Sequence, residues 1–250
     1  MPPCKICASK TKTIFDQQFE QNYYHCPNCE FIFLDESKTI SAEQEKEQYK
    51  FHKNTPDNQG YVKMFQDFIE QAIKPYKNQI KTALDFGSGP GPVLASLLKH
   101  EGFKVDIYDK HFAPEKVYQG KKYDLITATE VFEHLKDPLA TLKLLQSLLN
   151  KNGLIAIMTL FHNSKEEDFK KWWYRRDATH ICFYTPKTFE VMAEKLGMEV
   201  LLTDDKRICV LVAGLGFEPR LLASKASDLP LVDPAIFLTD TFDPTSNPAV

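Results

Sequence analysis

The chain has 250 residues, 43% of them hydrophobic, and a formal net charge of −3. This length and composition suffice for a full core, while the near-neutral charge argues against a broad nucleic-acid interface, which needs a basic face. No run of about 18 apolar residues is present, so we expect no membrane span. The first twelve residues lack the apolar core of a signal peptide, so we expect a cytoplasmic protein.

Residues 1–36 contain two C-x-x-C pairs separated by eighteen residues. In a reducing compartment such cysteines are metal ligands or free thiols rather than disulfides. Each pair forms a tight turn that directs two thiolates at one ion, and two turns complete a tetrahedron. We therefore predict a small zinc ribbon with a structural Zn²⁺, held by Cys4, Cys7, Cys26 and Cys29. The alternatives are reduced structural cysteines, or participation of His25, which adjoins Cys26.

Residues 37–79 are predicted to form a helical lid or linker. A charged helix is expected over 41–49, and an amphipathic helix over 60–77, where apolar side chains recur on one face. We expect this second helix to pack on a sheet as a lid over a cofactor cleft. His52 and Asn54 lie between the two helices, in a stretch that we interpret as a solvated linker, although they are near enough in sequence to reach the site.

A glycine-rich turn follows the apolar residues 80–86 and precedes an amphipathic stretch. This order predicts a strand, a tight turn and a helix whose free N–H groups point toward a ligand. The spacing is G-x-G-x-G, unlike the G-x-G-x-x-G of dinucleotide binders. Asp85, two residues before the first glycine, would repel a pyrophosphate but suits an ammonium group.

The stretch LDFGSGPG over residues 84–91 resembles the first motif of class I S-adenosylmethionine (SAM)-dependent methyltransferases. That resemblance implies SAM as the cofactor. It assigns cofactor contacts in this motif to Asp85, Gly87, Ser88, Gly89 and Gly91.

Strands and helices alternate over residues 80–214. We predict helices at 92–100, 137–149 and 186–196, and strands at 81–86, 103–108, 123–128, 153–160, 198–204 and 208–214. Such alternation implies an α/β fold with a Rossmann-like, doubly wound, mostly parallel sheet. Only about three residues join the last two strands, so that pair must be an antiparallel hairpin. A parallel sheet ending in an antiparallel strand is similar to the class I methyltransferase fold.

Ligands in such sheets bind beyond the carboxyl ends of the strands. Asp109 ends the second strand, 22 residues after Gly87, where an acid is expected to bind a ribose diol. The alternative role for Asp109 is a helix N-cap. In the resembling family another strand follows and contacts adenine, but residues 112–122 are short and lack its motif.

The predicted strand over 123–128 leads into the segment TATEVFEHL over residues 127–135. This segment resembles the V-x-E-H-L turn of the same family. The resemblance places Thr129 and Glu130 along the methionine part of SAM. His134 is a candidate general base because imidazole titrates near neutral pH. The alternative is that Glu133 and His134 fix the turn by hydrogen bonds.

Residues 161–184 contain both tryptophans, two arginines and two histidines, and lie where the family places substrate-specific insertions. Aromatic and guanidinium groups suit a flat or anionic substrate. His180 and Tyr184 are our second candidates for groups that touch the substrate. The alternative is an amphipathic helix whose aromatic residues cap the core. From 215 to 250 the periodicity ends, and we expect an irregular tail.

The leading hypothesis is a SAM-dependent methyltransferase that modifies carbon or oxygen of a small molecule, such as a sugar nucleotide. A second hypothesis is RNA methylation through the ribbon, although residues 1–50 carry six Lys/Arg against eight Asp/Glu. A third is a non-catalytic protein that binds SAM or a partner. We expect neither nucleic acid nor membrane as a partner, and the oligomeric state does not follow from the sequence.

Overall fold

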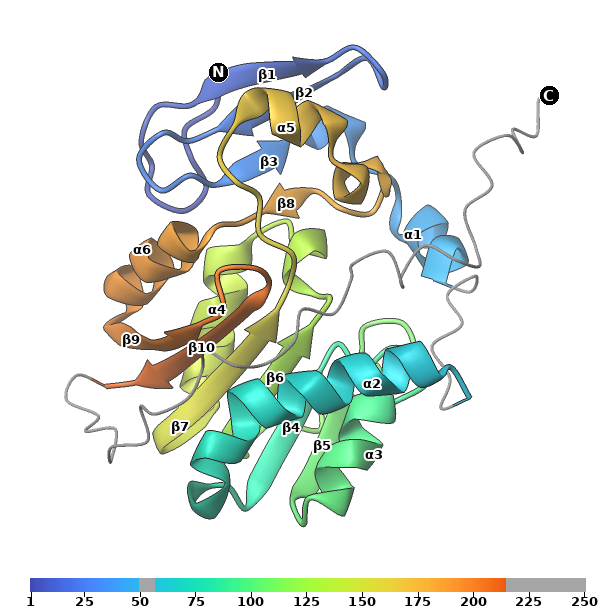
Figure 1. Cartoon of the computed structure of the whole chain (residues 1–250), viewed down its shortest axis with the longest axis vertical. Helices are drawn as coiled ribbons and strands as arrows, with labels where there is room; N and C mark the ends of the chain where they lie inside the picture. The colour runs from blue at the N-terminus through green and yellow to red at the C-terminus, as the bar shows by residue number, and fades with distance from the viewer. Residues whose placement is uncertain (50–56, 215–250) are drawn as a thin grey trace.

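Two sheets organise the chain and lie one above the other in Figure 1. The computed structural model describes residues 1–49 and 57–214. The predicted linker residues His52 and Asn54, and the predicted tail over 215–250, lie outside the described residues.

The larger sheet has six strands in the order β5-β4-β6-β7-β10-β9. The strands span Lys104–Tyr108 (β5), Thr82–Phe86 (β4), Tyr123–Thr129 (β6), Leu149–Met158 (β7), Ile208–Ala213 (β10) and Met198–Thr203 (β9). The first four are parallel, and β10 is antiparallel to both β7 and β9. The predicted doubly wound sheet with a terminal antiparallel hairpin is therefore confirmed.

The additional strand that the resembling family has between β5 and β6 is absent from the described residues, where the sequence indicated a short segment without the family's motif. Residues 110–122 form turns, with only a single bridge between Asp109 and Ala113. Consequently β5 is an edge strand of the sheet.

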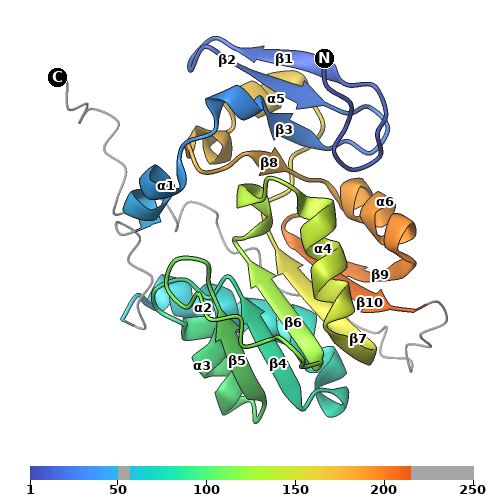
Figure 2. The same ribbon diagram turned by 180° about the vertical axis from the view of Figure 1, so that it is seen from behind.

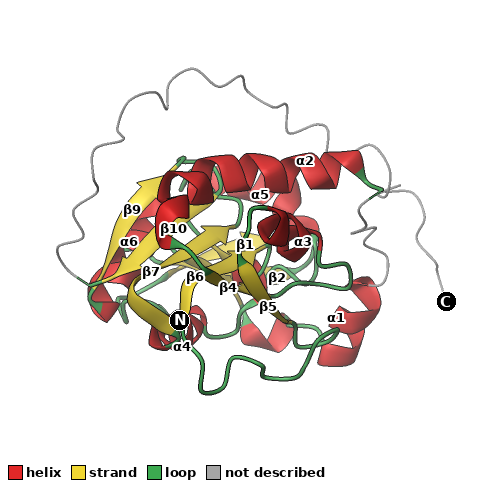
Figure 3. Ribbon diagram, turned by 90° about the horizontal axis from the view of Figure 1, so that it is seen from below, coloured by secondary structure: helices red, strands yellow, loops and turns green. Residues whose placement is uncertain are grey.

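Helices cover both faces of the large sheet, as Figure 3 shows. On one face, α2 (Gln59–Phe68) and α3 (Val93–His100) bury the even-numbered residues of β7, from Leu154 to Met158. On the other face, α4 (Pro138–Ser147) and α6 (Pro186–Leu196) pack against Ile155 and Ile157. Successive side chains of a strand point to opposite faces of the sheet. The almost continuous apolar run of β7 therefore packs against the helices on both faces.

The predicted helix over 60–77 begins as α2 but does not stay regular. It continues as a π-helical turn (Ile69–Ile73) and a 3₁₀ turn (Lys74–Gln79), where Pro75 lacks a backbone donor. The remaining α-helices are α1 (Ala42–Tyr49) and α5 (Glu166–Lys171). Within residues 1–49 and 57–214, no helix has both the length and the apolar character that a membrane span requires.

The smaller sheet combines three strands of the ribbon with one strand from residues 161–184. The ribbon strands are β1 (Lys12–Asp16), β2 (Gln21–His25) and β3 (Ile32–Leu34). The fourth, β8 (Cys182–Phe183), comes from the far side of the sequence and pairs antiparallel with β3. Figure 2 shows β8 between the ribbon and the large sheet, so the ribbon and residues 161–184 share one core.

Candidate functional site

The four ribbon cysteines lie at the tips of two equivalent turns. In each turn the residue after the second cysteine, Ala8 or Glu30, has a positive φ of 60° or 62°. Its N–H donates to the carbonyl of the first cysteine, Cys4 or Cys26, at 2.9 and 2.8 Å. This geometry turns the thiols of both pairs toward one point.

The sulfur separations suit one tetrahedral ion. The Sγ atoms of Cys4 and Cys29 are 3.5 Å apart, those of Cys7 and Cys26 are 3.4 Å apart, and all four lie within 4.8 Å of one another. Zn–S bonds of about 2.3 Å would place neighbouring sulfurs about 3.8 Å apart. No disulfide joins these cysteines, so all four remain available as thiolates.

The glycine turn after β4 is held against two neighbouring strands. The N–H groups of Gly87 and Ser88 donate to the carbonyl of Tyr108 at 2.7 and 3.2 Å. Gly87 has φ +85°, and a Cβ built on it would lie 2.2 Å from Cγ2 of Val131. Gly91 accepts from the N–H of Val93 at the start of α3. The turn thus needs glycine for its conformation and for its close approach to the end of β6.

Two acids flank this turn. Asp85 is buried and accepts a 3.0 Å hydrogen bond from Thr127 Oγ1, and burial raises its pKa to about 7. Asp109 Oδ2 accepts from the N–H of Gly89 at 3.0 Å, while its Oδ1 accepts from the N–H groups of His111 and Phe112. The second acid therefore fixes the glycine turn as well as its own loop.

The end of β6 brings the next predicted residues to the same edge. Thr129 is buried, while Glu130 is exposed, with φ +53°, and its N–H donates to Met158. Tyr61 of α2 lies close by: its burial, with the negative charges of Glu130 and Asp85, raises its pKa. The helix predicted as a lid thus contributes a side chain beside both carboxyl groups.

A cluster of titratable groups follows at η4 (Phe132–His134). Glu133 is fully buried and accepts a 2.6 Å hydrogen bond from the hydroxyl of Tyr174. His134 Nε2 lies 3.9 Å from the Glu133 carboxylate, and its ring centroid is 4.8 Å from that of His180. Burial lowers the pKa of His134, which favours the neutral imidazole. The structure therefore brings His134 and His180 together, although 45 residues lie between them.

Tyr184 does not join this cluster. Its ring is fully buried against Phe31 and Phe189, and its hydroxyl donates to the carbonyl of Phe132 at 2.7 Å. A core position with a satisfied hydroxyl leaves no room for a substrate. Tyr174, in the same insertion, instead reaches Glu133 and Glu130. Our sequence reasoning did not single it out, because its only signal was membership of an aromatic-rich stretch.

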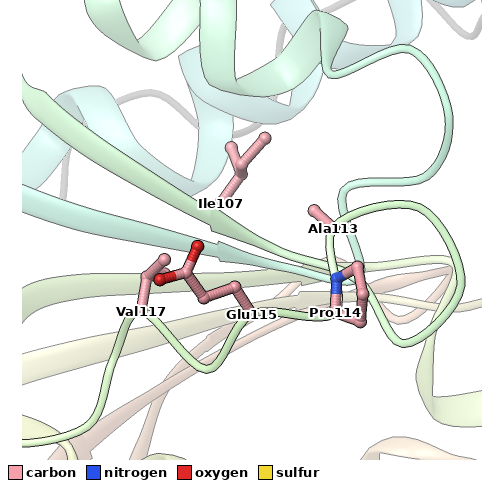
Figure 4. Close-up of a pocket in the computed structure, with 5 residues that line it drawn as sticks. All are labelled: Ile107, Ala113, Pro114, Glu115 and Val117. Carbon is pink, nitrogen blue, oxygen red and sulfur yellow. The ribbon is translucent and has the colours of Figure 1, made fainter.

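A pocket of about 350 Å³ lies beside edge strand β5, and Figure 4 shows its lining residues. They are Ile107, Ala113, Pro114, Glu115 and Val117. It is mostly apolar and borders the loop that Asp109 holds, but it contains none of the predicted site residues.

The family of the chain follows from its sequence as well as its fold. Residues 58–203, more than half of the chain, match the family described as "Methyltransferase domain". The chain belongs to this methyltransferase family. This membership confirms the resemblance to class I SAM-dependent methyltransferases that the glycine turn indicated. The match begins beyond the ribbon, so the four-cysteine module is not part of the methyltransferase domain as matched.

Known relatives of this methyltransferase match its middle part. The ubiquinone biosynthesis O-methyltransferase of Dinoroseobacter shibae is 29% identical over 123 residues, which are 46% of this chain and 49% of the relative. The enzyme of the same name from a Ruegeria species is 28% identical over the same length and shares of both chains. The chain thus spans about half the length of the curated relatives it matches.

A solved O-methyltransferase family protein from Burkholderia thailandensis is 13% identical. Its TM-score is 0.49, over 72% of this chain and 65% of that one.

Proposed function

We propose that this chain transfers a methyl group from SAM to a small-molecule acceptor. The observation that carries the proposal is the pair of contacts that ties the glycine turn to two strand ends: Gly89 to Asp109 and Gly87 to Val131. They gather acids of the kind that bind an ammonium group and a ribose diol around a glycine turn. The sulfonium of SAM supplies an activated methyl group, so the protein mainly has to position the reactants.

The residues proposed for SAM binding are those at the ends of β4, β5 and β6. Asp85 would face the ammonium group, Asp109 the ribose, and the Gly87–Gly91 turn the backbone of the cofactor. Thr129 and Glu130 would line the methionine part. The first turn of α3 also lies at this edge and has no side-chain cap.

The acceptor side of the site is proposed to be Glu133, His134 and His180, with Tyr174 behind them. The named relatives methylate oxygen in ubiquinone biosynthesis, which supports a hydroxyl acceptor here. A hydroxyl must lose its proton as the methyl group arrives, and neutral imidazoles are suited to that task. We retain carbon methylation as the second chemistry, because the same groups can remove a proton from an activated carbon.

The ribbon is proposed to hold Zn²⁺ through its four thiolates, which would close the coordination sphere and leave no position for a substrate. It would therefore be structural. It contacts the catalytic part directly: Thr188 of α6 donates to the carbonyl of Cys29 at 2.9 Å.

Calorimetry with SAM, followed by transfer of labelled methyl groups to a panel of small hydroxyl compounds, tests the proposal. Asp109→Asn should weaken SAM binding at least tenfold. Asp106→Asn is the matched control, because Asp106 lies on the same strand but pairs with Lys121 and Tyr123. If the intact chain bound no SAM, the proposal would fail, and equal affinities of both variants would remove Asp109 from the site.

A further inference from the structure

The acceptor-side cluster has the composition of a second metal site. Glu133, His134 and His180 each offer one ligand atom, and these three atoms lie within 4.8 Å of one another. Glu133 and His134 follow β6, whereas His180 comes from the insertion. The insertion is fastened there by the N–H of Ile181, which donates to the carbonyl of Glu133 at 2.8 Å. Two imidazoles and one carboxylate thus converge from segments far apart in sequence.

Both imidazoles are oriented as metal-binding imidazoles usually are. Nδ1 of His134 lies 2.9 Å from the carbonyl of Thr179, and Nδ1 of His180 lies 2.7 Å from the carbonyl of Tyr174. A carbonyl only accepts, so each Nδ1 carries a proton, and Nε2 is the ring atom that would ligate an ion. Backbone carbonyls that fix the tautomer in this way are the common outer support of histidine ligands.

The carboxylate is the third ligand and lacks a partner on one oxygen. Glu133 has 0% exposure; Oε1 accepts from Tyr174, but Oε2 is buried with no hydrogen-bond partner among the described residues. Burying an ionised carboxylate without a counter-charge is costly. Both nearby imidazoles use their Nδ1 protons on backbone carbonyls rather than on this carboxylate. A cation between the three groups would supply the missing charge.

We propose that Glu133, His134 and His180 bind a divalent first-row transition-metal ion, separate from the ribbon zinc. Imidazole and carboxylate ligands select such ions, and three protein ligands leave positions open for an exogenous oxygen. In a methyltransferase that oxygen would be the acceptor hydroxyl; the ion would then increase its acidity in place of an imidazole base, and the proton would pass to solvent. This role rests on the proposed function, whereas ion binding itself does not. Two further carboxylates border the cluster: Asp177 Oδ2 lies 3.7 Å from His180 Nε2, and Glu130 shares the Tyr174 hydroxyl with Glu133.

Co²⁺ titration of the zinc-loaded full chain tests the site. With the ribbon thiolates occupied by zinc, we expect one further equivalent of Co²⁺ to bind, with weak d–d absorption bands and no sulfur-to-cobalt charge transfer. His180→Ala should lower the affinity at least tenfold, because even loss of outer support costs about 10–100-fold. His100→Ala, an exposed histidine at the end of α3, is the matched control and should bind as the parent does.

Far-UV circular dichroism and zinc content will show whether His180→Ala is folded; Glu133→Gln, which keeps the shape of the side chain, provides the second variant. Absence of a second cobalt equivalent in the parent chain, or undiminished binding by both folded variants, would overturn the site. Methyl transfer is measured separately. Transfer by a chain without a second ion would refute the ion's role in the reaction, whereas ion binding without SAM binding would refute only the proposed function.

Discussion

Arg175 and Asp16 form a buried ion pair although 159 residues separate them. Nη1 lies 2.5 Å from Oδ2, and the side chains are only 2% and 3% exposed. The same guanidinium donates from Nε to the carbonyl of Lys170 at 2.8 Å. The pair therefore joins the tip of the ribbon to the insertion that carries Tyr174 and His180.

Breaking this pair should destabilise the whole chain. Asp16→Ala leaves the guanidinium buried without its counter-charge, which typically costs about 3–5 kcal/mol. Glu36→Ala is the control, because the Lys5–Glu36 pair has a largely exposed carboxylate and should contribute less than about 1 kcal/mol. Urea unfolding of the zinc-loaded variants measures both values, and similar losses would contradict a special role for the buried pair.

Zinc removal should stop methyl transfer more completely than SAM binding. Without the ion the ribbon loses its main source of folding energy, and β3 then no longer supports β8, next to His180. No strand of the ribbon's sheet pairs with β4 or β5, whose ends carry proposed SAM residues. A strong chelator should release one zinc per chain and abolish transfer while calorimetry still detects SAM.

Cys209→Ala supplies the control for that experiment, because Cys209 lies in β10 and is not part of the four-cysteine group. It should retain zinc. Equal loss of SAM binding and transfer after chelation would show that the ribbon supports the entire fold.

Gly87→Ala should disrupt the glycine turn for two separable reasons. The new Cβ would meet Val131 at 2.2 Å, and φ +85° is strained for any residue with a side chain. Thermal unfolding should show a loss of several kcal/mol. Adding Val131→Ala should recover the steric part and leave about 1–3 kcal/mol of backbone strain. A double variant no better than the single one would refute the contact.

Asp85 should make the ligand-free chain less stable as pH rises. Its pKa is about 7 in the folded chain, above the 3.8 of an exposed aspartate. The folded state therefore holds the proton more tightly, so the contribution of Asp85 to stability is greatest below pH 4 and is lost as pH rises through 7. Asp85→Asn should lack this slope. Urea unfolding at pH 5 and pH 8 compares the parent chain with this variant. The same change in unfolding free energy in both chains would contradict the raised pKa of Asp85.

Tyr174→Phe and Tyr184→Phe distinguish two buried hydroxyls of the insertion. Each loses a hydrogen bond, and about 1–3 kcal/mol of stability is expected in both cases. Only Tyr174 contacts Glu133 beside the histidines, so only its variant should reduce the transfer rate, by about tenfold or more. Equal rates would return Tyr184 to the candidate site.

Local patterns predicted most elements of this fold. The strands over 82–86, 104–108 and 123–129 begin and end within one residue of the prediction. Two of them are largely apolar and buried, while edge strand β5 alternates apolar and polar residues. The helix Pro186–Leu196 has the predicted bounds. Its capping box at Thr185 and Thr188 and its left-handed Gly197 are local signals. The cysteine spacing likewise predicted the cluster of four thiols that the structure contains.

Long-range contacts could not be predicted in this way. A two-residue strand such as β8 has no periodicity, and its partner β3 lies about 150 residues away. The same holds for the Arg175–Asp16 pair and for the hydroxyl of Tyr174 on Glu133. The core position of Tyr184 was equally out of reach, because composition marks an aromatic stretch without telling which ring faces the core.

The pairing of β3 with β8 also sets an order of events during synthesis. The ribbon cysteines leave the ribosome first, yet the strand that completes their sheet follows about 150 residues later. At 5–20 residues per second this interval lasts about 8–30 s. During that time Phe31 and Phe33, both fully covered in the finished protein, have no partner ring from Tyr184 or backbone from Cys182. A nascent chain would thus expose an apolar strand edge. Early zinc binding would restrict the conformations of the unfinished ribbon and so reduce its opportunity to misfold.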